Sequence, residues 1–287
     1  MNSRSPWKIG SARAPTHQDY KKEKLASAAS AMGTSANNIG QTYEAALSKP
    51  QSSSVFEMPN IYSAVGNAMR SIFDSRIHTP PILDPESYFP EAPSFAKSWT
   101  FIRDEALTIA GRLSTVPKFH ELMRAQEPIS ANDGHDWRVF VLRAYGHDVR
   151  QNLDRCPATA ELVGRCPSVL SASFSFLAPG KYIPPHRGPF RGIIRFHLGL
   201  SMPLGDDGRP GAILWVDGEE YRLADGDTLL WDDTFPHKVL NATGQVRVAL
   251  LLDVWRSGMP ADMAALSHLV VAGARLAAYM RQTSFSH

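Results

Sequence analysis

The chain has 287 residues, of which 43% are hydrophobic and 20% are charged, and its formal net charge is +2. This length suffices for one or two domains with a sizeable core, and the near-neutral charge gives no reason to expect nucleic acid as a partner. Cys156 and Cys166 lack the CxxC spacing of a metal or redox site, so a reducing, cytoplasmic environment is expected. No segment has the pattern of a secretory signal or a transmembrane helix.

Residues 1–54 differ in composition from the rest of the chain. They are rich in Ala, Ser, Lys, Asn and Gln and contain few aromatic or branched apolar residues. Because such a segment buries too little apolar surface to offset its loss of conformational entropy, a disordered tail is predicted. Residues 55–287 are predicted to form a single domain, helical at about 55–125, β-rich at about 137–256 and ending in a helix at about 261–282.

Apolar residues recur at helical spacing in the first part of this domain. One stripe comprises Ile61, Val65, Met69 and Ile72, and a second comprises Phe95, Trp99, Ile102, Ala106 and Ile109. Both stripes predict helices, and the second predicts an amphipathic helix that covers a buried surface. The segment at 261–282 is also amphipathic. Two interpretations of it remain open: it packs on the β-rich region, which is the commoner outcome, or it rests on a membrane surface.

After Trp137 the apolar pattern acquires a period of two, which predicts strands. The predicted strands are 137–146, 168–177, 191–200, 212–216, 219–223, 227–231 and 246–255. Asp217-Gly218 stands where a tight hairpin turn would join two of them. Many short strands after a helical segment favour a mainly β fold, a sandwich or barrel braced by helices.

Two of these strands carry charged residues in apolar surroundings. In 191–200, Arg195 and His197 share one face, while the opposite face is apolar. If the sheet closes on itself, both side chains line a cavity as ligands for an anion; if the face is exposed, nothing special follows. The strand at 246–255 is apolar on both faces, so Arg247 at its start needs a partner. That partner is either an internal carboxylate or a carboxylate ligand.

His186 and His237 each lie at the end of a predicted strand. Two imidazoles on a rigid barrel can hold a divalent transition metal with open positions for other ligands. The usual facial triad has a carboxylate two residues after the first histidine, and here that position is Gly188. The spacing alone leaves open that both histidines are ordinary hydrogen-bonded residues.

Four segments occur in an order and at intervals that resemble a known family. They are SFSFLAPG (173–180), HRGPFRGIIRFHLGL (186–200), DGDTLLWDDTFPHKVLN (225–241) and VRVALLLDVW (246–255). With their surroundings, from about Pro90 to Pro260, they resemble the aspartyl/asparaginyl β-hydroxylase family of iron and 2-oxoglutarate-dependent oxygenases. The resemblance implies a double-stranded β-helix (jelly-roll, cupin-like) barrel with N-terminal helices and a C-terminal helix.

The resemblance also implies roles for seven residues. His186 and His237 match the two iron ligands of a family that binds its metal without a third protein carboxylate, and Asp233 matches the acidic residue that holds a water there. Four residues match the binding site for 2-oxoglutarate. Arg195 and His197 match the groups that hold the carboxylate next to the metal, Arg247 matches the partner of the distal carboxylate, and Ser175 matches the hydrogen-bond donor beside it.

The activity implied is hydroxylation of an unactivated C–H bond with Fe(II), 2-oxoglutarate and O2, which yields succinate and CO2. The expected target is the β-carbon of an aspartyl or asparaginyl residue or a related amino acid. Residues 184–200 also resemble lipid A acyl-chain 2-hydroxylases, and the same fold can serve as a non-catalytic binding module. The expected substrate is therefore an amino acid, a peptide or a lipid, with membrane contact only through the C-terminal helix. Trp137 and Arg143 are expected to face it.

Overall fold

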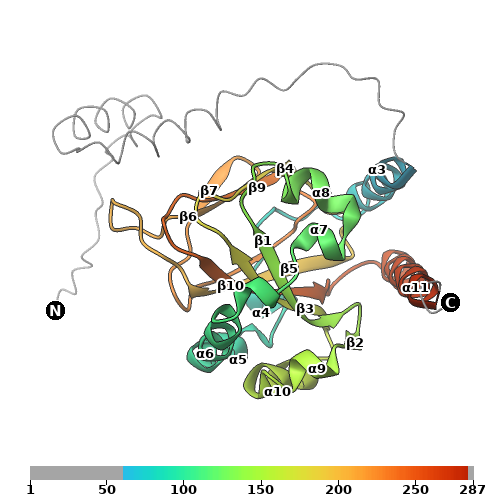
Figure 1. Cartoon of the computed structure of the whole chain (residues 1–287). Helices are drawn as coiled ribbons and strands as arrows, with labels where there is room; N and C mark the ends of the chain where they lie inside the picture. The colour runs from blue at the N-terminus through green and yellow to red at the C-terminus, as the bar shows by residue number, and fades with distance from the viewer. Residues whose placement is uncertain (1–60, 284–287) are drawn as a thin grey trace, which may run out of the picture. The chain divides into compact units, whose positions relative to one another are not determined.

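The structure is a computed structural model in which residues 61–283 are described (Figure 1). The predicted tail at 1–54 lies outside these residues. The described chain is mainly β, with helices before and after the strands, as the sequence predicts.

Two antiparallel sheets contain the described strands. The six-stranded sheet has the order β2-β1-β3-β10-β5-β8, and the four-stranded sheet has the order β4-β9-β6-β7. The larger sheet comprises β1 (Trp137–Ala144), β2 (His147–Asp148), β3 (Val169–Leu177), β5 (Ile193–Ser201), β8 (Thr228–Trp231) and β10 (Arg247–Trp255). The smaller sheet comprises β4 (Tyr182–His186), β6 (Ala212–Val216), β7 (Glu219–Tyr221) and β9 (His237–Asn241).

From β3 onward, successive strands alternate between the two sheets, except that β6 and β7 form a hairpin within the smaller sheet. This order is that of a double-stranded β-helix and confirms the predicted fold. The predicted barrel is not closed, because no ladder among the described strands joins the sheets; β7 remains an edge, and the outer side of β8 pairs only with residues 81–83, through an isolated bridge from Ile82 to Trp231. These strands have only three and four residues, so few backbone groups are available to pair there.

The predicted hairpin turn joins β6 and β7. Asp217 and Gly218 both have positive φ, 51° and 90°, which is the conformation of a two-residue type I′ turn. Aspartate tolerates this left-handed conformation better than most residues, and glycine adopts it freely. The turn places the end of β6 next to the start of β9, where His237 lies opposite Val216.

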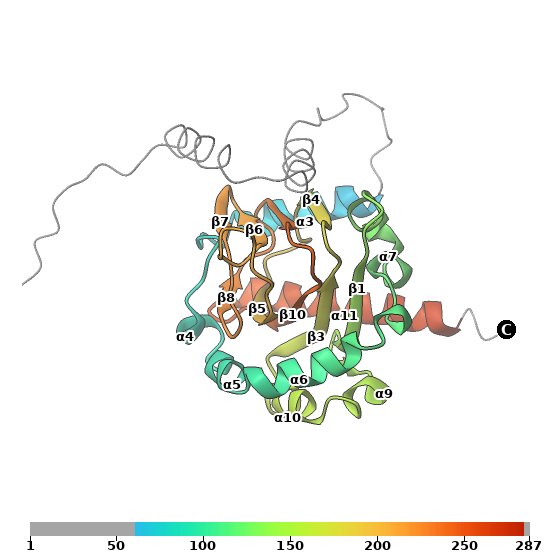
Figure 2. The same ribbon diagram turned by 60° about the vertical axis from the view of Figure 1, so that its left-hand side comes forward.

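Helices cover the outer face of the larger sheet. They are α4 (Pro85–Tyr88), α5 (Ala92–Lys97), α6 (Trp99–Ala110), α9 (Arg150–Leu153) and α10 (Pro157–Arg165), with α7 (Phe119–Leu122) and α8 (Glu127–Ser130) nearer β1 and β4. Figure 2 shows α5, α6 and α10 beside one another on this side of the molecule. Phe89 and Phe95 pack on Phe196 of β5, with ring centroids 5.3 and 6.0 Å away. The apolar face of β5 is therefore buried as predicted.

One predicted helix is two helices in the structure. The apolar stripe that begins at Phe95 is buried at Phe95, Ile102, Ala106 and Ile109, as expected. However, Ser98 has φ −97° and ψ 9°, which ends α5 and begins α6. A periodic pattern does not reveal such a break, because the stripe continues across it.

The first described helix, α3 (Ile61–Asp74), and the last, α11 (Ala261–Thr283), belong to one apolar cluster at another side of the sheets. Phe73 of α3 packs on Phe190 with ring centroids 5.5 Å apart, and Met263 and Val271 of α11 belong to the same cluster. An ion pair joins Arg76 to Asp262. The C-terminal helix thus packs on the β-rich region, and no helix among residues 61–283 has the length and apolarity to cross a membrane.

Candidate active site

The predicted site residues face the interior between the two sheets. Arg195 of β5 lies directly opposite Asp253 of β10 and Trp231 of β8. Residues directly opposite in antiparallel strands project from the same face, so these three side chains share the inner face. His197, two residues further along β5, shares it too. The inner face of the larger sheet therefore carries a concentration of polar and aromatic groups.

His186 and His237 come together from the smaller sheet. They are paired residues of β4 and β9, and their ring centroids are 4.0 Å apart. The Nδ1 atoms lie 2.9 Å from the carbonyl oxygens of Pro184 and Phe235, so the Nδ1–H tautomer leaves both Nε2 lone pairs available to a metal. Burial lowers the pKa of His186 to about 4 and that of His237 well below its ordinary value, so both rings are neutral at pH 7.

Asp233 lies beside this pair, in space that Gly188 leaves empty. The N–H of Gly188 donates to the backbone carbonyl of Asp233 at 2.7 Å. A Cβ at position 188 would overlap the Asp233 carboxylate, so only glycine leaves room for it. The carboxylate thus occupies the region into which the acidic residue of a facial triad would project. Burial raises the pKa of Asp233 to about 6, with Arg195 acting in the opposite direction.

The donor set fits a two-histidine metal site. Residues 61–283 contain no cluster of three or more His, Cys, Asp or Glu side chains that could hold a metal ion. Two neutral imidazoles with free Nε2 atoms suit a transition metal, and the adjacent carboxylate can accept a hydrogen bond from a metal-bound water.

A buried ion cluster holds the segment between Asp233 and His237. Asp232, with no exposed surface, accepts from the guanidinium of Arg256 and lies 3.4 Å from Nε of Arg191. It also accepts from the backbone N–H of Thr234 at 3.0 Å. This cluster was not predicted, and the parity argument placed Arg191 on β5, whereas β5 begins after it, at Ile193.

Arg195 is paired with two carboxylates through Nε and Nη2. Its Nε and Nη2 lie 3.0 and 2.9 Å from Oδ1 of Asp253, and Nη2 lies 3.3 Å from Oδ2 of Asp233. The structure therefore brings Arg195 together with the histidine pair and Asp233. Sequence reasoning did not identify Asp253 as its partner, because pairing across 58 residues depends on strand register.

Arg247 forms a second group with His197 and Ser175. Its Nη2 lies 2.5 Å from Nε2 of His197, and its Nη1 lies 3.5 Å from Oγ of Ser175. Trp137 donates to the same Oγ at 3.1 Å, so this aromatic residue lies beside the group, and its expected contact with the substrate stays a prediction. All four residues are buried.

This second group has unsatisfied charge and hydrogen-bonding capacity. Within the described chain, no Asp or Glu forms an ion pair with Arg247, which argues against an internal salt bridge. Its Nε has no partner, and burial lowers its pKa to about 10, so it is still charged at pH 7. Because Arg247 donates to Nε2 of neutral His197, the proton of that ring lies on Nδ1, which is also unpartnered. A carboxylate ligand fits both atoms.

Arg143 does not face the interior, contrary to expectation. A shift in register between Val141 and Arg143 places Arg143 opposite Ala172, which belongs to the outer core. There it pairs with Asp148 at 2.7 Å and donates to the carbonyl of Val163. Such a β-bulge turns the following residue to the other face, and a regular alternation cannot reveal it.

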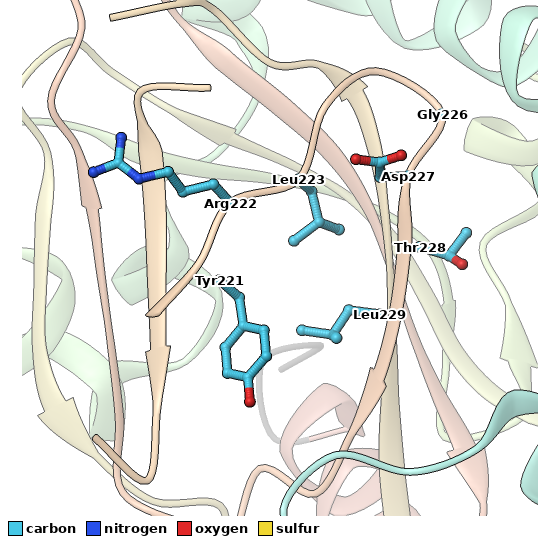
Figure 3. Close-up of a pocket in the computed structure, with 7 residues that line it drawn as sticks. All are labelled: Tyr221, Arg222, Leu223, Gly226, Asp227, Thr228 and Leu229. Atoms are coloured by element: carbon cyan, nitrogen blue, oxygen red, sulfur yellow. The ribbon is translucent and has the colours of Figure 1, made fainter. Parts of the chain in front are cut away.

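Trp231 is an interior residue that sequence reasoning missed. Its ring packs edge-on against the ring of His237, with centroids 4.7 Å apart and planes at 78°. Its Nε1 is buried and has no hydrogen-bond partner. A cavity of about 430 Å³ lies between β7 and β8 (Figure 3). None of the seven predicted site residues lines this cavity, but Leu229, which does, lies directly opposite His197.

Comparisons with known proteins identify a family and individual relatives. A sequence model of the family described as aspartyl/asparaginyl beta-hydroxylase matches residues 96–257. An ornithine lipid ester-linked acyl 2-hydroxylase from Rhizobium tropici is 33% identical over 62% of each chain. The human aspartyl/asparaginyl beta-hydroxylase is 27% identical over 56% of this chain and 20% of its own. The chain therefore spans less than two thirds of either relative.

Solved structures match more weakly. The Cupin_2 domain of a transcriptional regulator from Enterobacter cloacae aligns with 42% of this chain and 96% of its own, at 16% identity and a TM-score of 0.29. The family match, in contrast, covers more than half of the chain and all seven site residues. The protein belongs to the aspartyl/asparaginyl β-hydroxylase family.

Proposed function

We propose that this protein is a hydroxylase that binds Fe(II) through His186 and His237 and uses 2-oxoglutarate and O2 as co-substrates. The main support is Arg247, a buried arginine without a carboxylate partner among residues 61–283, in the same interior as two neutral, paired imidazoles. With 2-oxoglutarate and O2, bound iron supplies the chemistry that inserts oxygen into an unactivated C–H bond, with succinate and CO2 as co-products.

The second group binds the end of 2-oxoglutarate that lies away from the metal. Arg247 pairs with its distal carboxylate, the Nδ1–H of His197 is free to donate, and Ser175 adds a hydroxyl at the same place. Charge-assisted hydrogen bonds of this kind are roughly twice as strong as neutral ones. Because Arg247, His197 and Ser175 are buried, water is excluded from the ion pair between Arg247 and the distal carboxylate, which strengthens that interaction further.

Arg195, Asp253 and Asp233 orient the ligands at the metal. Arg195, on the same strand face as His197, reaches the carboxylate of 2-oxoglutarate next to the metal, and Asp253 keeps its guanidinium in position. Asp233 holds a water on the metal from the space beside Gly188. These roles need neutral imidazoles, which the low pKa values of the two histidines provide.

The proposed substrate is a methylene group next to a carbonyl group. The names of both relatives describe this chemistry: carbon 2 of an acyl chain adjoins the ester carbonyl, and the β-carbon of Asp or Asn adjoins the side-chain carbonyl. The acyl chain is the first candidate, because the Rhizobium protein shares more of this chain at higher identity. An aspartyl or asparaginyl residue is the second.

Purified protein provides the test. Isothermal titration should show binding of 2-oxoglutarate in the presence of Zn(II), and with Fe(II), ascorbate and substrate the protein should form succinate above the level of the His237→Ala variant. Mass spectrometry of lipids and of peptides from cells with and without the gene should show one added oxygen in one of the two classes. Binding of 2-oxoglutarate without succinate from either class would favour the non-catalytic module instead.

A further inference from the structure

Three buried side-chain atoms in the described chain have no hydrogen-bond partner, and all three belong to the interior between the sheets. They are Nδ1 of His197, Nε of Arg247 and Nε1 of Trp231. In the proposed function, 2-oxoglutarate accepts hydrogen bonds from the first two atoms. The indole N–H of Trp231 has no role in it. A buried donor without an acceptor is unfavourable, so its presence in the site needs an explanation.

Trp231 lies beside the histidine pair and away from Arg247 and Ser175 of the 2-oxoglutarate group. In the larger sheet, Ser175 belongs to β3 and Arg247 to β10, whereas Trp231 belongs to β8, the edge strand beyond β5. Its ring contacts His237 from that edge. The indole therefore lies next to the histidine pair and opposite Arg195, far from Arg247 and Ser175, which the proposed function gives to the distal carboxylate of 2-oxoglutarate.

The surroundings of Trp231 are apolar and extend toward the cavity between β7 and β8. It packs in one cluster with Leu214 and Val216, and Tyr221 and Leu229 pack against that cluster. Tyr221 and Leu229 also line the cavity between β7 and β8 (Figure 3). Ile82, which forms a β-bridge with Trp231, packs against the same cluster. An apolar chain that enters between β7 and β8 would pass Tyr221 and Leu229 and reach Trp231, beside His237, inside the strand segment that Ile82 borders.

The charges nearby indicate which acceptor suits this N–H. Arg195, the cation directly opposite Trp231, is already paired with Asp253 and Asp233. In the proposed function Arg195 also holds the metal-side carboxylate of 2-oxoglutarate, so a further carboxylate beside Trp231 would be an additional negative charge at this cation, and its burial would be costly. A neutral carbonyl oxygen needs only one neutral donor, which the indole supplies.

We infer that the indole N–H of Trp231 donates a hydrogen bond to the carbonyl oxygen of the molecule to be hydroxylated, and so places the adjacent methylene beside His237. This inference rests on the proposed function and sharpens it: an ester or amide carbonyl is selected, and a free carboxylate is not. Trp231 is thereby a specificity residue for an acyl ester or an asparaginyl amide.

The test uses two variants of the full chain. Trp231→Phe keeps an aromatic ring without the donor. Replacement of the Trp231 indole by benzothiophene, through an unnatural amino acid, keeps the shape and removes only the N–H, which guards against a packing defect. Trp215→Phe is the matched control, because Trp215 lies on β6 under Lys238, whose Nζ is 4.7 Å from the ring centroid.

Equilibrium binding is measured by calorimetry on Zn(II)-loaded protein with 2-oxoglutarate, so that no turnover occurs. The probes are 1-decanoylglycerol against its alkyl ether, and a short asparaginyl peptide against the same peptide with 2-aminobutyrate, which lacks the side-chain amide. For the ester or the asparaginyl probe, both Trp231 variants should raise Kd about tenfold, the effect of one lost hydrogen bond. The Kd values for the ether, for the aminobutyrate peptide and for 2-oxoglutarate should not change.

Equal Kd values for wild type and both variants, or no binding of any probe by the wild type, would overturn the inference while the proposed function stands, provided that 2-oxoglutarate still binds. Failure of the wild type to bind 2-oxoglutarate would refute the proposed function, and the inference with it. If the wild type binds the ester probe more tightly than the asparaginyl probe, the carbonyl belongs to the lipid class. If it binds the asparaginyl probe more tightly than the ester probe, the carbonyl belongs to the peptide class.

Discussion

Replacing Arg247 with methionine should have opposite effects on stability and on ligand binding. Arg247 is a buried cation without an ion-pair partner in the described chain, and keeping such a charge out of water costs several kcal/mol. The substitution removes that cost but also removes the contacts with His197 and Ser175, which are worth about 1–2 kcal/mol together. We expect the free energy of unfolding to rise by about 1–2 kcal/mol, and Tm by a few degrees.

The same substitution should strongly weaken the binding of 2-oxoglutarate. Two charge-assisted hydrogen bonds to a carboxylate contribute about 1.5–3 kcal/mol each, so Kd for 2-oxoglutarate should rise at least about 100-fold in Arg247→Met. Calorimetry with Zn(II) measures the affinity, and thermal unfolding without ligand measures the stability.

Arg256→Met is the matched control. Arg256 is also buried and lies just after β10, but it is paired with Asp232. Its removal leaves a buried carboxylate with only the more distant Arg191, and we expect a loss of about 3–5 kcal/mol and a Tm lower by about 10 °C. If Arg247→Met lowers Tm to the same extent, or binds 2-oxoglutarate as wild type does, the assignment of Arg247 as a ligand-binding residue is wrong.

Three further predictions concern the metal site and the core. His237→Ala should eliminate Zn(II) binding in calorimetry, whereas His147→Ala, at an exposed position, should not; equal affinities would exclude the histidine pair as the site. Gly188→Ala should displace the Asp233 carboxylate and weaken Zn(II) binding about tenfold, whereas Gly244→Ala, with nothing within 4 Å of the added Cβ, should leave it unchanged. Both cysteines are buried with raised pKa values, about 12 for one of them, so they remain protonated thiols at pH 8. They should react with a thiol reagent only at the rate of unfolding, and fast labelling of the native protein would contradict their burial.

The sequence predicts the strands of this fold well, because alternation survives wherever one face packs on helices. Phe196 and Arg195 illustrate this point: one lies against the outer helices and the other in the interior. The Asp217-Gly218 turn was also predicted, since few residue pairs accept positive φ twice. Their positions at strand ends and the family resemblance marked His186 and His237 as a pair, and the structure brings them together.

Other features depend on information that no local pattern contains. The bulge before Arg143 reverses its face, and the break at Ser98 divides a continuous stripe. The partners of Arg195 and Arg256 come from distant strands and loops, so their pairing follows from register and not from spacing. The unsatisfied N–H of Trp231 is equally invisible in sequence, because an unmet hydrogen bond is a property of the assembled interior.

The position of β10 has a consequence for how the protein is made. This last strand lies between β3 and β5 at the centre of the larger sheet, although it follows them by dozens of residues. During synthesis, β3 and β5 are therefore complete before their partner strand, and each keeps an unpaired edge until residues 247–255 leave the ribosome. A chain truncated before that point would contain both histidines but expose two strand edges, and a pause there would prolong the same exposure. Such edges promote aggregation before the site can form.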